Sequence, residues 1–170
     1  MKKLLSLILC LMMLVSGCAL AEDTSVVEVF EGNWINFDDG LNVYLPADWL
    51  IAEEMPEEYV AAGIYFAAAS PDETNLCTIA WKELPAETTI EAAQAELATV
   101  YTDAVIMETQ FTQMVFYTDA ERNMMNFVML DPTQPGMYMF CFRPVTEELA
   151  LTAGMIIGTV HHTPVEEAAE

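Results

Sequence analysis

The sequence predicts one α+β domain, in which helices cover an antiparallel β-sheet of about six to seven strands. Short apolar segments with alternating polarity lie between turn signals, which is typical of half-buried strands. A segment in the middle of the chain has the apolar spacing of a helix, and one near the C-terminus begins with helix-capping residues. Because the strands come in runs, antiparallel pairing is favoured over a parallel α/β sheet.

The first half of the chain predicts two hairpins. In LNVYLP, Leu41, Val43 and Leu45 alternate with Asn42 and Tyr44, and the turn signal DDG joins this segment to the preceding WINF. GIYFAAAS and NLCTIAWKEL flank a second turn signal, PDET. Between the hairpins we expect a corner at PADW and an acidic loop around Pro56.

A helix that packs on the sheet is predicted next. Thr88 and Glu91 have the spacing of a capping box. Residues three and four apart form one apolar stripe: Ile90, Ala93, Leu97 and Val100.

The second half predicts three consecutive antiparallel strands and a final helix. The strands are MVFYTD, MMNFVMLD and GMYMFCFRP, separated by DAERN and PTQPG. Thr146 is the expected N-cap of the helix, with Glu147 and Glu148 in its first turn and His161 and His162 at its end. Residues in the inward phase of these elements are expected to form one core: Leu41, Val43, Leu45, Trp49, Ile79, Leu97, Phe127, Phe140 and Ile156.

The N-terminal residues read as a secretory signal. Lys2 and Lys3 precede an apolar run, so residues 1–21 are interpreted as a signal peptide, 22–33 as a flexible lead-in, 34–162 as the domain and 163–170 as a disordered acidic tail. LVSGCALAED allows two cleavages. VSGC resembles a bacterial lipobox, which predicts a diacylated Cys18 at the new N-terminus, whereas ALA predicts cleavage after Ala21 and a released protein. We expect the lipid anchor, with an extracytoplasmic, membrane-attached protein.

The charge of the chain excludes several partners. The formal net charge is −22, and beyond the signal segment the basic residues are Lys82, Arg122 and Arg143. Binding to nucleic acid or an anionic lipid surface requires clusters of Lys or Arg, so no nucleic acid is expected, and the membrane is reached only through a lipid on Cys18. The partner, a protein or a small molecule, and the oligomeric state stay open.

Chemistry-bearing residues are few. Ser25 or Ser70 would have to pair with His161 or His162 for nucleophilic catalysis, and no carboxylate pair is marked by its spacing, so no catalytic residue is assigned. Cys77 and Cys141 lie inside apolar runs, where a disulfide and two buried thiols both fit.

No metal or cofactor site is assigned from the sequence either. Placing Gly40 sixth in a calcium loop puts apolar residues at ligand positions. Adjacent histidines on a helix diverge. The methionines of the expected strands are interpreted as core filling: Met114, Met124, Met125, Met129, Met137 and Met139.

The opening GLNVYLPADW and the element order from about Trp34 to His162 resemble those of the PsbP-like superfamily, which includes many small bacterial lipoproteins. The resemblance implies an α/β/α sandwich that docks onto partners, usually without catalysis, and it assigns no functional residue. We therefore expect a non-catalytic envelope lipoprotein or secreted protein that binds a protein or a small ligand. The alternative is a carboxylate-based cation binder or an extracytoplasmic enzyme, with the acidic segment EEMPEE, residues 53–58, as its candidate site.

Five aromatic residues allow two interpretations: they line a pocket, or they belong to the ordinary core. They are Trp34, Trp49, Tyr59, Tyr65 and Phe66.

Overall fold

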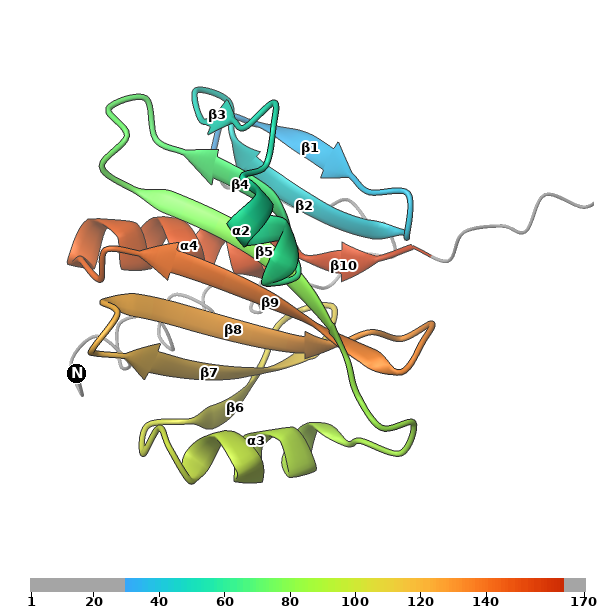
Figure 1. The fold of residues 1–170 in the computed structure, drawn as a ribbon. Coiled ribbons are helices and arrows are strands. Elements are labelled where there is room, and N and C mark those ends of the chain that lie inside the picture. Colours follow the sequence, from blue (N-terminus) through green and yellow to red (C-terminus); the bar gives the residue numbers. More distant parts are fainter. Residues whose placement is uncertain (1–29, 164–170) are drawn as a thin grey trace, which may run out of the picture.

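The computed structural model describes residues 30–163, which have the predicted α+β fold (Figure 1). Residues 1–29 and 164–170 lie outside the described part of the chain. The expected signal peptide, Cys18, most of the lead-in and most of the acidic tail therefore lie outside it as well. The described strands form two sheets, one of seven strands and one of three, where the sequence predicted a single sheet.

The larger sheet is antiparallel throughout. Its spatial order is β3-β4-β5-β9-β8-β7-β6. The strands are β3 Leu50–Ile51, β4 Ile64–Ala69, β5 Leu76–Glu83, β6 Val105–Glu108, β7 Gln113–Asp119, β8 Met124–Leu130 and β9 Gly136–Arg143. The predicted second hairpin is β4–β5 and the predicted meander is β7–β8–β9, so both are confirmed. The edge strands β3 and β6 are too short for their alternation to be recognised in the sequence.

The predicted first hairpin forms the smaller sheet together with a third strand. β1 (Gly32–Asn36) pairs with β2 (Leu41–Pro46), and β10 (His161–His162) pairs with the other edge of β2. The turn needs a glycine, because Gly40 has φ +91° and a Cβ there would lie 2.3 Å from the Thr163 carbonyl oxygen. Because His161 and His162 form β10, they do not lie at the end of a helix, and that prediction was wrong.

Residues 30–163 also form three helices: α2 (Glu57–Ala61), α3 (Ile90–Ala98) and α4 (Glu147–Thr159). α2 occupies part of the segment that was expected to be an acidic loop. α4 is followed by extended backbone at Val160 (ψ 122°), so the chain leaves the helix directly into β10.

The helix caps agree with the sequence at α4 and differ by one residue at α3. Thr146 Oγ1 accepts the Leu149 N–H at 3.1 Å, as predicted. At α3 the cap is Thr89, whose Oγ1 accepts the Ala92 N–H at 3.2 Å. The Thr88 hydroxyl instead donates to the Pro85 carbonyl at 2.8 Å, so the predicted capping box is wrong.

The two faces of the larger sheet carry two separate clusters of buried residues. We call them the α4 face and the α3 face, after the helix that packs on each. The α4-face cluster joins the sheet to α4 and to β2, and it contains most of the predicted core: Leu41, Val43, Leu45, Ile79, Phe127, Phe140 and Ile156. Figure 1 shows α4 and the smaller sheet behind the larger one, with α2 in front of it.

Two predicted core positions and one position of the predicted helical stripe differ. Leu97 is half-buried and packs on the α3 face, against a cluster that includes Val115 and Val128, because α3 lies across the sheet from α4. Trp49 is only partly buried against the α4-face cluster. Val100, two residues beyond the end of α3, is 71% exposed and belongs to neither cluster.

Candidate functional site

The serine and histidine candidates for nucleophilic catalysis are not brought together. Ser70 lies in the β4–β5 turn, where its hydroxyl donates to Asp72 Oδ1 at 2.6 Å and accepts the Asn75 N–H at 3.0 Å. His161 and His162 lie on β10, at the opposite end of the molecule from this turn (Figure 1). Ser70 therefore stabilises a turn, and Ser25 lies outside the described residues.

The candidate metal ligands are not brought together either. Within residues 30–163, no three His, Cys, Asp or Glu side chains converge closely enough to hold a metal ion. Met114, Met125 and Met129 are buried in the α4-face cluster, which confirms their interpretation as core. Met137 and Met139 pack partly buried on the α3-face cluster, and Met124 is half-buried on the same face of the sheet.

Cys77 and Cys141 are free thiols on neighbouring strands. Cys77 is paired with Phe142 and faces the α4-face cluster, whereas Cys141 is paired with Thr78 and faces the other side of the sheet. Since adjacent positions of a strand point to opposite faces, the backbone holds the two sulfur atoms on either side of the sheet. Burial raises the pKa of the Cys141 thiol to about 11, so this thiol is a poor nucleophile.

The aromatic candidates are mainly structural. A bulge in β4 turns Tyr65 and Phe66 toward the same side, where both rings pack edge-on against Phe37 at 5.4 and 5.3 Å between ring centroids. Trp34 packs against Tyr44 and His161 in the smaller sheet. Trp49 is partly buried against the core. Tyr59, on α2, is the exception, because its hydroxyl reaches Arg143.

Asp39, from the first turn, takes part in two partly buried hydrogen bonds. Its Oδ1 accepts the Leu41 N–H at 3.1 Å and its Oδ2 accepts the Tyr138 hydroxyl at 3.0 Å, which ties the smaller sheet to β9. Burial, followed by the nearby Asp39 carboxylate, raises the pKa of Tyr138, so its hydroxyl keeps its proton and remains a donor. The Tyr65 hydroxyl is buried and has no hydrogen-bond partner among residues 30–163. Asp39 therefore has a structural role.

Asp131, directly after β8, is held by a second set of hydrogen bonds. Its Oδ2 accepts the Trp81 indole N–H at 3.0 Å, and its Oδ1 accepts the backbone N–H and the hydroxyl of Thr133 at 2.8 and 2.7 Å. Burial opposes ionisation of this carboxyl, but the hydrogen bonds from Thr133, Gln134 and Trp81 outweigh it and lower its pKa to about 2. Both carboxylates are thus occupied by groups of the protein itself.

A groove of about 540 Å³ lies on the α3 face, at the end of the sheet where β9 finishes. We call it the arginine groove. It is lined by residues 50–52, 67–69, 73–74 and 76 on one side, and by residues 122–123 and 143–144 on the other. Its volume lies within the range of about 300 to 1,000 Å³ that is usual for small-ligand sites.

The lining combines apolar surface with positive charge. Leu50 and Ile51, on the edge strand β3, are 53% and 47% exposed. Arg122 and Arg143 reach the groove from the β7–β8 turn and from the end of β9, against a single acidic lining residue, Glu73. In a chain of net charge −22, two of the basic residues beyond the signal segment therefore meet at one place.

The two arginines differ in what holds them. Arg122 forms an ion pair with Asp119 at 3.2 Å, the only salt bridge within residues 30–163. No carboxylate of residues 30–163 lies within ion-pair distance of Arg143, and one of its guanidinium nitrogens donates to the Tyr59 hydroxyl at 3.3 Å. Tyr59 thus positions Arg143 and leaves its positive charge uncompensated by a neighbouring acid.

Sequence reasoning missed this groove because its residues come from five separate segments. Arg122 and Arg143 were recognised only as rare cations, and no pattern relates residue 50 to residue 143. The available signal was the scarcity of basic residues combined with the meander, since a β7–β8 turn and the end of β9 must lie at the same end of a sheet.

Comparison with known proteins adds a likeness of fold. No protein-family model matches the sequence, and no curated protein is similar to it in sequence. A protein of Bacteroides thetaiotaomicron VPI-5482, with a crystal structure at 1.50 Å resolution, aligns with a TM-score of 0.55 and 16% identity over 81% of this chain. The chain spans about half, 51%, of the length of that protein. No helix within residues 30–163 is long and apolar enough to cross a bilayer.

Proposed function

We propose that the protein is a non-catalytic binding module of the bacterial cell envelope, anchored by a diacylated Cys18, and that it binds its ligand in the arginine groove. The observation that carries the proposal is the lining of this groove. It combines exposed apolar side chains, Leu50 and Ile51, with the uncompensated guanidinium of Arg143. Apolar walls with a few convergent polar groups are typical of ligand sites.

Two further observations support a binding role. The residues that line the groove include no serine, cysteine or histidine, so its chemistry is that of recognition rather than of nucleophilic attack. The opening GLNVYLPADW, which here forms β2 and the following corner, is similar to the opening of PsbP-like proteins, and membership of that superfamily is part of this proposal.

The experiment is to block the groove and ask whether a ligand is lost. The full-length chain, purified from a bacterial host, is analysed by native mass spectrometry for co-purified ligand. Ala69→Trp places an indole in the groove, whereas Ala86→Trp adds the same side chain at an exposed position elsewhere. We expect Ala69→Trp alone to lose the ligand. Retention of the same ligand by both variants would contradict the proposed site.

The anchor is tested separately. Cys18 follows VSG, the chain carries a net charge of −22, and few basic residues are available to hold it against an anionic membrane. We expect the wild-type protein in the membrane fraction with a diacylated Cys18 at its N-terminus, and Cys18→Ala in the soluble fraction. A soluble wild-type product that starts at Glu22 would refute the anchor and leave the groove proposal intact.

A further inference from the structure

The α3 face carries a thiol with a polar residue on either side of it. Cys141 is half-buried on β9, and its ladder partners are Thr78 on β5 and Asn126 on β8. Both partners are buried inside strands. The other buried polar residues of the described part of the chain close a turn or a helix end: Ser70, Asp119, Asp131 and Thr159. The two polar residues beside Cys141 therefore have no such role in a turn or a cap.

Asn126 lacks an acceptor that an ionised Cys141 would supply. The residue is 1% exposed, and its side-chain nitrogen has no hydrogen-bond partner among residues 30–163. Such buried donors are rare, and hydrogen bonds to an anion are stronger than those to a neutral group. On the other side, a hydrogen bond with Thr78 and the positive charge of Arg143 act on the same sulfur. The surroundings of Cys141 thus favour a thiolate.

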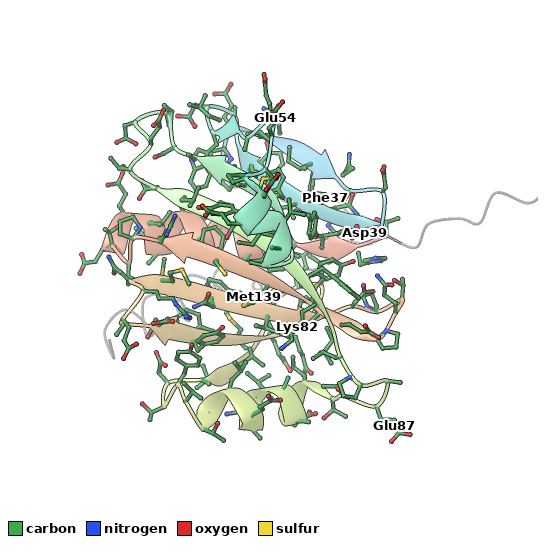
Figure 2. The ribbon with its side chains drawn as sticks, in the orientation of Figure 1. Phe37, Asp39, Glu54, Lys82, Glu87 and Met139 are labelled. Atoms are coloured by element: carbon green, nitrogen blue, oxygen red, sulfur yellow. The ribbon has the colours of Figure 1, made fainter. Side chains whose placement is uncertain are left out.

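Met139 brings a second sulfur atom to this place. It lies two residues before Cys141 on β9, so both side chains project from the same face, about 6.5 Å apart along the strand. The Tyr117 hydroxyl donates to the Met139 sulfur at 3.5 Å, and burial followed by the nearby Cys141 thiol raises the pKa of Tyr117. Met139 is half-buried in the middle of the sheet, between α2 and α3 (Figure 2). Its three rotatable side-chain bonds let the thioether approach the thiol.

A thiolate and a thioether together suit monovalent copper. Soft sulfur ligands select Cu⁺, and one thiolate neutralises its single charge, which suits a half-buried position near Arg143. Zinc is bound by Cys, His, Asp and Glu rather than by thioethers. A zinc ion would also keep a net positive charge here, because no three of those side chains converge within residues 30–163.

We propose that Cys141 and Met139 bind one Cu⁺ ion on the α3 face, with Thr78 and Asn126 donating hydrogen bonds to the thiolate. A copper–sulfur bond replaces the S–H bond of Cys141, the proton passes to solvent, and the copper keeps its oxidation state. The site is separate from the arginine groove, whose lining includes neither sulfur residue. It is therefore independent of the ligand proposed for that groove.

The test is a Cu⁺ titration of the full-length chain without oxygen, in competition with bicinchoninate, a chelator that becomes coloured when it binds this ion. We expect Cys141→Ala to lose one equivalent of bound copper. Cys77→Ala removes the same group on the opposite face of the sheet and should retain that equivalent. Cys10 and Cys18 belong to every variant, so they do not contribute to the difference.

Substitutions of the neighbours test the rest of the site. Met139→Leu should weaken Cu⁺ binding at least about 10-fold, and Asn126→Leu about 10-fold, the lower end of the usual effect of a group that hydrogen-bonds a metal ligand. Met125→Leu makes the same change as Met139→Leu within the α4-face cluster and should leave the affinity unchanged. Urea midpoints without copper show that each variant is folded. Added copper should raise the midpoint of the wild type but not that of Cys141→Ala.

Several outcomes would overturn the assignment. They are an unchanged copper stoichiometry in Cys141→Ala, equal losses in Cys141→Ala and Cys77→Ala, or equal affinities of Met139→Leu and Met125→Leu. Zinc that displaces Cu⁺ from Cys141 at equal concentration would show that the metal class is wrong. None of these results bears on the arginine groove, which is tested by Ala69→Trp.

Discussion

Tyr138→Phe should lower the free energy of unfolding, because the Tyr138 hydroxyl joins the β1–β2 turn of the smaller sheet to the centre of the larger sheet. The tyrosine is fully buried, and its hydroxyl donates to Asp39 Oδ2 at 3.0 Å. A hydrogen bond to a charged group contributes roughly 1.5 to 3 kcal/mol. Asp39 is only half-buried, so water can partly replace the lost donor, and we expect a loss near the lower end, about 1.5 to 2 kcal/mol.

Urea denaturation of the full-length chain, followed by tryptophan fluorescence, measures this loss. With a slope of about 2 kcal/mol per molar urea, the midpoint should fall by about 0.7 to 1 M. Tyr117→Phe is the matched control on the opposite face of the sheet. Its hydroxyl donates to the Met139 sulfur at 3.5 Å, and thioether sulfur is a weak acceptor, so the loss should be below about 0.5 kcal/mol.

Equal destabilisation by the two substitutions would refute this reasoning. It would mean that the ring environment, and not the bond to Asp39, determines the cost. A double-mutant cycle with Asp39→Asn provides the second check, because the coupling energy between residues 39 and 138 should be about 1 kcal/mol or more. A coupling near zero would show that the turn does not depend on this bond.

Three further predictions test the helices and the Asp131 carboxylate. Thr146→Ala should destabilise the protein by about 1 kcal/mol in urea denaturation, because the N-cap of α4 is lost; no loss would show that α4 does not depend on this cap. Leu97→Ala should lower the free energy of unfolding by about 1 to 2 kcal/mol, less than the about 2 to 5 kcal/mol expected for Ile156→Ala, because Leu97 is half-buried and Ile156 is fully buried. A larger loss for Leu97→Ala than for Ile156→Ala would contradict the position of α3. The pKa of Asp131 is lowered in the folded state to about 2, so its contribution is present above pH 4 and is lost as the pH falls toward 2. Asp131→Asn should therefore cost about 1 to 2 kcal/mol at pH 6, after allowance for solvent screening, and much less at pH 2.5; a difference that does not change with pH would contradict the assignment.

Sequence patterns predict the strands of this domain where the local signal and the tertiary contact agree. Leu41, Val43 and Leu45 alternate in the sequence and are all buried on one side of β2, so the first hairpin was predicted correctly. The α4 cap at Thr146 is equally local. The misplaced cap of α3 shows the limit, because Thr88 and Thr89 are adjacent and only the backbone conformation decides which hydroxyl faces the helix.

What could not be predicted depends on partners distant in sequence. β10 forms because His161 and His162 meet the free edge of β2 about 120 residues earlier in the chain, and no helical or strand period extends over two residues. Leu97 has the same helical spacing whichever face of the sheet its helix covers. The arginine groove is the extreme case, since its charge and its apolar wall come from segments that carry no common pattern.

The unequal size of the two buried clusters gives the domain two levels of cooperativity. α3 rests on the small α3-face cluster at one edge of the sheet, while β5, β8 and β9 share the extensive cluster beneath α4. Regions with few buried apolar contacts open at lower free energy than the global unfolding transition. Amide hydrogens of α3 should therefore exchange through local opening, and a protease should cleave there first. The arginine groove is lined by β3, β4, the β4–β5 turn, the start of β5, the β7–β8 turn and the end of β9, with no residue of α3, so such an opening leaves the binding site folded.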